Sequence, residues 1–393
     1  MAYRWEINAL RGLMLVLMTF THLPTRWSSP LGQPFGFVSA AEGFVMISAY
    51  MAGLVYTERE RQHGADEMRS AFLGRALKIW ACQVALLAFA FTIVALLGAV
   101  SHAGAIDSLL AFYFERPLLA LVSGLLLVYN PALLDILPMY VLFMLISPLL
   151  LLHGLRHGWM PILALSVGLW LAAQGQFGGW LYAVATDGLK LKVPLEQTGA
   201  FDLLAWQFLW VLGLWLGSAH SRTPQVVPTR FPRPMVIVAL VLAVVCMVWR
   251  HAVGQAPFPG NEPLNLLFDK WRLGPLRLLD FLALMLLLMH FAPELKSHLP
   301  RLRVLETLGA AALPVFCAHL VVVLTVLALL GEATTPRPLW LDTLLVLVTF
   351  AVLYGVAQLS AAADRRAKAL KQRVSERRQR RRAAVTPAPG AAQ

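Results

Sequence analysis

The stretch RWEINALRGLMLVLMTFTHLP, residues 4–24, decides the fold class because it is apolar over the length of a membrane span and still carries charge inside it. A helix needs roughly 20 predominantly apolar residues to cross the hydrocarbon core of a bilayer. No small-residue cleavage site follows this stretch, so it does not resemble a cleavable signal peptide. We therefore predict a first membrane span, retained in the mature chain, over residues 8–24.

Composition extends this prediction to the rest of the chain. The 393 residues are 59% hydrophobic and 14% charged, whereas a soluble globular chain is roughly 25% charged. Further apolar runs follow the first, separated by segments rich in turn formers and charges, and we detect no internal repeat. The sequence predicts an all-α, polytopic transmembrane helix bundle of about ten spans. The predicted spans are 8–24, 38–56, 76–99, 132–152, 159–175, 201–218, 234–252, 275–292, 307–330 and 339–361.

The distribution of Lys and Arg predicts the orientation. With the N-terminus inside, about 24 of the 33 basic residues fall on the cytoplasmic side, where membrane proteins carry their excess of positive charge. An even number of spans then places both termini in the cytoplasm. We expect a multi-pass protein of the bacterial inner membrane, with residues 1–361 as its membrane domain.

Residues 362–393 form a separate basic tail. About ten Lys and Arg residues lie after Asp364, and they account for most of the net charge of +12. A basic run next to a span typically binds anionic lipid headgroups, and docking of a partner is the alternative. We expect a disordered cytoplasmic tail on anionic lipids, and no nucleic-acid partner.

Ionisable side chains within the spans are the candidates for function, because each costs roughly 2.5–3.5 kcal/mol on insertion scales. Arg11 and His22 are separated by eleven residues, which is about 20° past three full helical turns, so both lie on one stripe about 16 Å apart. Histidine titrates near neutral pH and suits a general base. The alternatives are a snorkelling anchor at Arg11 and an interfacial histidine at position 22.

Three further groups of residues have both a functional and a structural interpretation. Glu42, at the outer end of the second span, either orients His22 or is solvated, and His319 inside the ninth span is either a packing residue or part of a site. Arg75 and Lys78 share a helical face at the cytoplasmic boundary, where they either clamp phosphates or set the topology.

Aromatic residues in the segments predicted to lie outside, 100–131, 176–200 and 253–274, indicate either an interfacial belt or a platform for a carbohydrate.

These residues resemble the signature of membrane acyltransferase-3 proteins, in which an arginine precedes a histidine on the first span. The Arg75 and Lys78 pair and the VFCAHL pattern at 315–320 fit the same signature. The chain resembles the OpgC family more closely, over residues 4–24, FGFVSAAEGFVMISAYMAGLVY (35–56), LLDILPMYVLF (133–143) and FDLLAWQFLWVLG (201–213). The resemblance covers most of the predicted spans and leaves out the basic tail. Members of this family succinylate osmoregulated periplasmic glucans.

The resemblance implies transfer of a succinyl group from cytoplasmic succinyl-CoA to a glucan hydroxyl in the periplasm. By motif match, it implies that His22 is the catalytic base with Arg11 as its partner, and that His319 belongs to the site. It also implies donor binding by Arg75 and Lys78. Arginine is common at position 78 in the wider pattern, whereas this chain has lysine. A lysine ammonium is a point charge and cannot bind a phosphate through two parallel hydrogen bonds, as an arginine guanidinium can.

The same mechanism suggests roles for polar residues at other spans. We expect Glu42 or Asp135 to orient the imidazole, and Tyr140 and Gln207 to bind or orient the acceptor. An anionic acyl group calls for a cation near His22, and Arg26 is the candidate. We expect acyl-CoA as a co-substrate, no bound cofactor and no metal. The alternative function is a transporter or flippase of an acyl or glycan intermediate, although the absence of a detectable repeat argues mildly against it.

Overall fold

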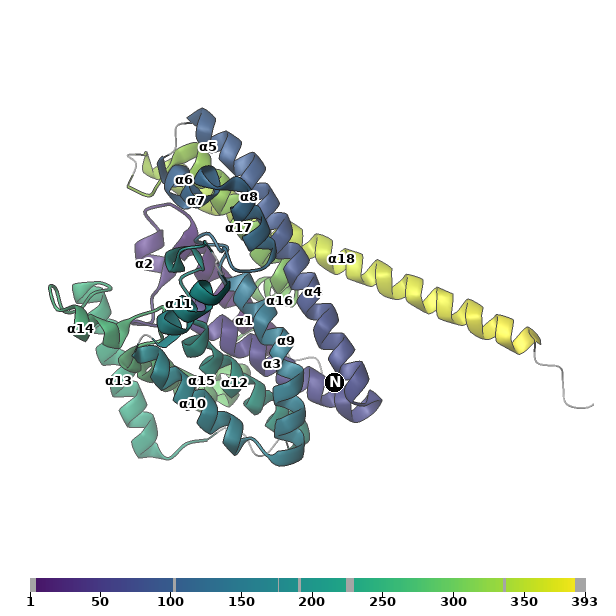
Figure 1. Ribbon diagram of the computed structural model, residues 1–393. Helices are drawn as coiled ribbons and strands as arrows, with labels where there is room; N and C mark the ends of the chain where they lie inside the picture. Colours follow the sequence, from purple (N-terminus) through teal and green to yellow (C-terminus); the bar gives the residue numbers. More distant parts are fainter. Residues whose placement is uncertain are drawn as a thin grey trace, which may run out of the picture.

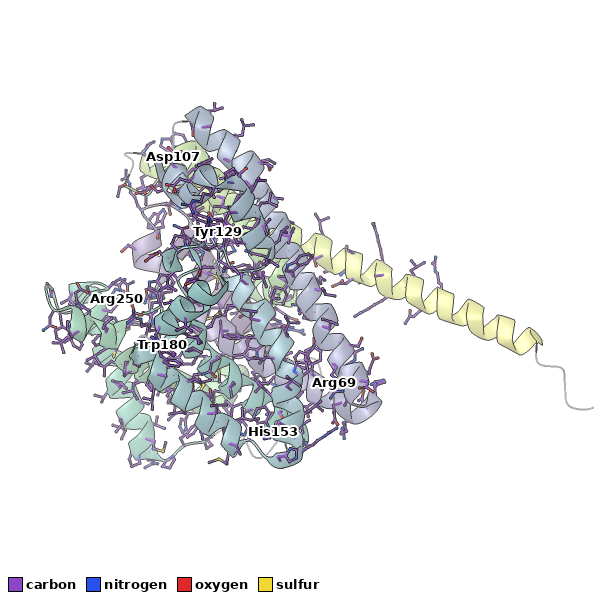
Figure 2. The ribbon with its side chains drawn as sticks, viewed as in Figure 1. Arg69, Asp107, Tyr129, His153, Trp180 and Arg250 are labelled. Carbon is purple, nitrogen blue, oxygen red and sulfur yellow. The ribbon has the colours of Figure 1, made fainter. Side chains whose placement is uncertain are left out.

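The computed structural model describes residues 5–101, 104–175, 177–189, 192–223, 230–334 and 337–385. Every regular element in this part of the chain is a helix, which confirms the predicted all-α class. Figure 1 shows a body of crossing helices from which α18 extends away. In Figure 2, Asp107 and Arg69 lie at opposite ends of this body.

The N-terminal half contains long helices that are candidate spans. A group of short helices follows the predicted third span. The helices of this half are α1 (Trp5–His22), α2 (Ser28–Gly32), α3 (Ala40–His63), α4 (Ala65–Phe89), η1 (Ala90–Val94), α5 (Ala95–Ser101), α6 (Gly104–Leu109), α7 (Ala111–Glu115), α8 (Pro117–Leu125) and α9 (Ile136–His157). The predicted third span is longer than expected, because α4, η1 and α5 form one continuous run over residues 65–101 with a π-helical segment inside it.

The C-terminal half alternates long helices with short connecting turns. Its elements are α10 (Met160–Gln174), α11 (Phe177–Leu189), η2 (Leu195–Gln197), α12 (Leu203–Arg222), α13 (Arg233–Val253), α14 (Glu262–Asn265), η3 (Leu266–Phe268), α15 (Pro275–His298), α16 (Arg303–Ala310), α17 (Ala312–Leu330) and α18 (Leu339–Val385).

Eight helices in the described part of the chain are long and apolar enough to cross a membrane, and a bent pair raises the number to nine. In the bent pair, α10 and the first part of α11 meet at 86°, with the undescribed residue 176 between them. The helix α1 is not among the eight, since charged and polar residues such as Glu6, Asn8 and Arg11 interrupt its apolar sequence. The membrane character is therefore confirmed, while the count of ten and the orientation stay predictions.

The helix of the last predicted span continues into the basic tail. The helix α18 includes the last predicted span and continues through the basic residues to Val385, while residues 386–393 lie outside the described part. Alanine, lysine, arginine and glutamine are strong helix formers, and extending an existing helix avoids the cost of nucleation. The span therefore propagates its helix into the tail.

Glycines allow the central helices to approach at backbone distance. A methyl group at Gly12 of α1 would overlap the carbonyl oxygen of Leu305 in α16, and one at Gly309 of α16 would overlap the carbonyl oxygen of Asn8. The same holds between α3 and α12, where Gly53 faces the carbonyl of Leu214. Small residues at such contacts are the usual means of packing helices in lipid.

Candidate active site

A cavity of about 290 Å³ lies between α1, α3, α4, α9 and α17. Its wall is mostly apolar, and its polar side chains are Arg11, Ser48, Tyr56, Arg75 and Tyr140. Arg11 Nε is buried and has no hydrogen-bond partner among the described residues. Two guanidinium groups in an apolar wall favour an anionic ligand, because an unpaired charge is costly to bury.

The two residues of the predicted donor clamp lie in different environments. Arg75 lines the cavity, whereas Lys78, one turn further along α4, is exposed and does not. Arg11 lines the cavity with Arg75, although it lies on α1, far away in the sequence. Donor binding by Arg75 and Lys78 stays a prediction.

The two histidines predicted as site residues meet beside this cavity. His22 Nδ1, at the end of α1, lies 3.2 Å from His319 Nε2 on α17, and the two rings are almost parallel at 16°. His319 is 1% exposed. The ring of Phe316 lines the cavity and contacts the ring of His319, with centroids 4.8 Å apart. The histidine pair is therefore separated from the cavity by an aromatic side chain.

Hydrogen-bond partners assign the tautomers of both rings. His319 Nδ1 lies 2.6 Å from the carbonyl oxygen of Phe316, and since a carbonyl only accepts, this nitrogen must donate. The neutral His319 then presents a lone pair at Nε2, which accepts a hydrogen bond from His22 Nδ1. His22 Nε2 is left with its lone pair free. The arrangement prepares His22 Nε2 to act as a base.

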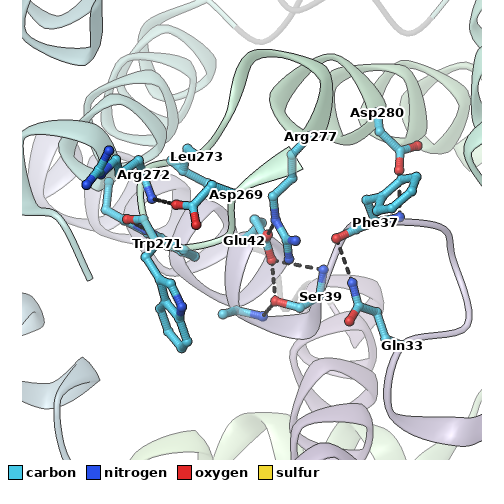
Figure 3. Close-up of polar contacts among 12 residues, drawn as sticks. Gln33, Phe37, Ser39, Glu42, Asp269, Trp271, Arg272, Leu273, Arg277 and Asp280 are labelled. Carbon is cyan, nitrogen blue, oxygen red and sulfur yellow. Dashed lines mark hydrogen bonds and ion pairs between the residues drawn. The ribbon is translucent and has the colours of Figure 1, made fainter. Parts of the chain in front are cut away.

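Glu42 is engaged in a separate buried network, shown in Figure 3. Its Oε1 is 2.5 Å from Arg277 Nε on α15, and both side chains are at most 1% exposed. Its Oε2 accepts hydrogen bonds from the backbone and hydroxyl groups of Ser39, which completes a capping box at the start of α3. Glu42 therefore joins α3 to α15, and the structure shows no hydrogen bond between it and His22 among the described residues.

The residues predicted to bind or orient the acceptor lie in three different environments. Tyr140 lines the cavity. Asp135 Oδ2 accepts a hydrogen bond of 3.0 Å from the backbone of Ala200, and burial raises the pKa of this carboxyl group. Gln207 exchanges hydrogen bonds with the hydroxyl and carbonyl of Ser166, so it connects α12 to α10. Of these three residues, Tyr140 lines the cavity and Asp135 and Gln207 do not.

Arg26, the cation predicted to lie near His22, has an acidic partner. It lies 3.7 Å from Asp342 at the start of α18, so it connects the end of α1 to the last span. Its role toward an anionic acyl group stays a prediction.

A family model described as OpgC protein matches residues 4–365 of the chain. No curated protein and no solved structure matches it.

The buried ion pair predicts that Glu42 is required for stability. Removing one partner of a buried pair costs about 3–5 kcal/mol, so Glu42→Gln should lower the midpoint of thermal unfolding in detergent. Replacing both partners, Glu42→Leu with Arg277→Leu, should recover most of the loss. The matched control is Glu67→Gln, which breaks the exposed pair with Arg59 and should cost under about 1 kcal/mol. Equal midpoints for Glu42→Gln and Glu67→Gln would contradict this assignment.

Proposed function

The chain belongs to the OpgC family, and from that premise we propose that it transfers a succinyl group from cytoplasmic succinyl-CoA to hydroxyl groups of periplasmic glucans. The family gives the chain a role in modifying osmoregulated periplasmic glucans, as a glucan-modifying transferase. The proposal adds the acyl group, its donor, the inner-membrane location and the place within the membrane acyltransferase-3 superfamily. Both termini are placed in the cytoplasm, on the evidence of charge distribution.

The observation that carries the proposal is the position of the histidine pair beside a cavity that holds two arginines. The helix α1 runs without interruption from Trp5 to His22, so it keeps Arg11 and His22 about 16 Å apart on one stripe. In the proposed orientation Arg11 and Arg75 lie toward the cytoplasm and His22 toward the periplasm. A long donor molecule can then enter from one side of the membrane while the reaction takes place at the other.

The cavity is suited to the arm of the donor rather than to its nucleotide. Its volume of about 290 Å³ is at the lower limit for a drug-sized ligand. We assign it to the pantetheine arm, with Arg11 and Arg75 holding the nearest phosphate oxygens at the cytoplasmic mouth. The nucleotide stays outside the membrane body, which avoids burying its remaining charges.

The chemical step follows from the tautomers of the two histidines. A glucan hydroxyl oxygen attacks the thioester carbonyl carbon while its proton passes to His22 Nε2. The imidazolium that forms is stabilised by donation from Nδ1 to His319 Nε2, whose own Nδ1–H is held by the Phe316 carbonyl. The carbon–sulfur bond then breaks, and the CoA sulfur takes the proton from His22. The products are a succinyl ester and free CoA, so atoms and charges balance.

We predict that His22→Ala abolishes transfer without unfolding the protein. A positioned general base contributes about 10²–10⁴-fold to the rate, so the release of free CoA by purified protein in liposomes, with glucan acceptor, should fall by that factor. The matched control is His153→Ala, an exposed histidine of α9 that Figure 2 shows at one end of the molecule, far from Tyr129. Translocation of glucan without release of CoA by the wild-type protein would favour the transporter instead.

The role of His319 as a positioning residue has its own signature. His319→Gln keeps an acceptor near the position of Nε2 and should retain much of the activity. His319→Phe removes the acceptor and should lower kcat by about 10–100-fold, the loss expected for a charge-assisted hydrogen bond. The Michaelis constants for donor and acceptor should be unchanged in both variants. A rise in KM with kcat intact would show that His319 serves binding rather than the base.

Because Arg75 lines the cavity and Lys78 does not, we propose that Arg75 rather than Lys78 binds the donor. Arg75→Gln should raise KM for succinyl-CoA about tenfold, because hydrogen bonds to charged groups are worth roughly 1.5–3 kcal/mol. Lys78→Gln, three residues away on the same helix and exposed, is the matched control and should leave KM within about threefold. Equal effects of the two substitutions would instead support general attraction of the donor by a basic rim.

A further inference from the structure

The turn that follows His22 is bound to the last helix through one buried carboxylate. Asp342 lies in the first turn of α18 and is 1% exposed. Its Oδ2 accepts a hydrogen bond of 3.2 Å from the backbone N–H of Arg26, and its Oδ1 lies 3.3 Å from Arg337 Nε. The side chain of Arg26 contacts the same carboxylate, with Nε 3.7 Å from Oδ2. Asp342 thus joins the turn after α1 to the segment before α18.

Arg337 extends this connection to the end of α17. Its side chain is 6% exposed, and its Nη1 donates a hydrogen bond of 3.2 Å to the carbonyl oxygen of Leu330, the last residue of α17. Its Nη2 donates to the carbonyl oxygen of Pro24, two residues after His22. Arg26 Nη2 donates in return to the carbonyl oxygen of Arg337. Two arginines and one aspartate therefore connect the ends of α1 and α17 with the start of α18.

Apolar packing places the same turn against α17. Leu23, which directly follows His22, is buried in one cluster with Val323 and Val326 of α17. Val323 comes about one helical turn after His319. Leu23 and His22 therefore contact neighbouring turns of α17, the first through apolar side chains and the second through its imidazole. A displacement of the turn would move His22 as well.

His22 needs this support because it is the last residue of α1. Helix ends fray, and the backbone holds a terminal residue less firmly than one in the middle of a helix. The distance of 3.2 Å between His22 Nδ1 and His319 Nε2 is at the long end of the usual range for a hydrogen bond, so a small shift of the turn would break it. The orientation of His22 Nε2 therefore depends on what holds residues 23–26.

We propose that Asp342 is a positioning residue for the catalytic base. Together with Arg26 and Arg337, it holds the turn after α1 in place, and His22 then keeps its hydrogen bond to His319. This inference rests on the proposed function, in which His22 Nε2 is the base. The carboxylate is the member that both arginines share. Without it, the buried guanidinium group of Arg337 loses its counter-ion, and Arg26 loses both of its contacts with α18.

The test is a double-mutant cycle between Asp342 and His319, measured as succinyl transfer from succinyl-CoA to glucan by purified protein in liposomes. Asp342→Ala should lower kcat about 10–100-fold, as His319→Phe should, because both disrupt the same hydrogen bond. The Michaelis constants for donor and acceptor should stay within about threefold of wild type. In the His319→Phe background, Asp342→Ala should lower kcat by less than about threefold, because residues that act through one contact are not additive. Asp342→Asn keeps an acceptor for the backbone of Arg26 and should retain more activity than Asp342→Ala.

A second readout does not depend on activity. The ¹⁵N NMR signals of the His22 ring, assigned by their absence in His22→Ala, report its tautomer and hydrogen bonding, and they should move in Asp342→Ala. The matched control is Asp202→Ala, because Asp202 also accepts backbone hydrogen bonds at the start of a helix, from Leu204 and Ala205 of α12. This control should lower the midpoint of thermal unfolding and leave the signals of His22 in place.

The outcomes separate this inference from the function beneath it. Losses in kcat that multiply in the double variant, or a kcat of Asp342→Ala close to that of wild type, would overturn the inference and leave the proposed function standing. If Asp342→Ala does not fold, Arg337→Gln replaces it in the cycle, because it removes the hydrogen bonds of Arg337 to the carbonyls and leaves Asp342 paired with Arg26. If wild-type protein transfers no succinyl group, the proposed function fails. Signals of His22 that are unchanged in the folded variant overturn the positioning role in either case.

Discussion

The close contact between α1 and the segment around α16 is the constraint on which the rest of the site depends. Gly12 and Gly309 let the two backbones meet where a single added methyl group would overlap a carbonyl oxygen. Because α1 carries both Arg11 and His22, this contact sets the depth of the arginine in the cavity and the reach of the histidine toward α17. Helices in lipid lack a hydrophobic drive to associate, so close packing of this kind must hold them.

Some polar groups inside the bundle bind one another across helices. Glu42 binds Arg277 Nε, and Gln207 binds Ser166. Two buried guanidinium nitrogens, Arg11 Nε and Arg277 Nη2, have no hydrogen-bond partner among the described residues, and of the two side chains Arg11 lines the cavity. In the proposed function an anionic donor completes the interactions of Arg11.

The positions of these groups also give the proposed site a direction. Arg11 and Arg75 line the cavity, Phe316 separates the cavity from His319, and His22 pairs with His319 beyond it. A molecule that extends from the arginines to the histidines therefore passes an aromatic boundary. Such an arrangement suits an acyl group carried on a long arm, since the arm can cross where the charged nucleotide cannot.

The sequence by itself determined the all-α membrane class and the common stripe of Arg11 and His22. Both follow from local rules, because the apolar length of a span and the rotation per residue of a helix do not depend on distant parts of the chain. It also pointed to His319 and Arg75 through their types and depths. Only the tertiary structure decided that His22 pairs with His319 across 297 residues and that Arg75 lines the cavity with Arg11 rather than with Lys78. These are contacts between helices, and side-chain volumes and glycine positions along whole interfaces determine which helices meet, so no local spacing reveals them.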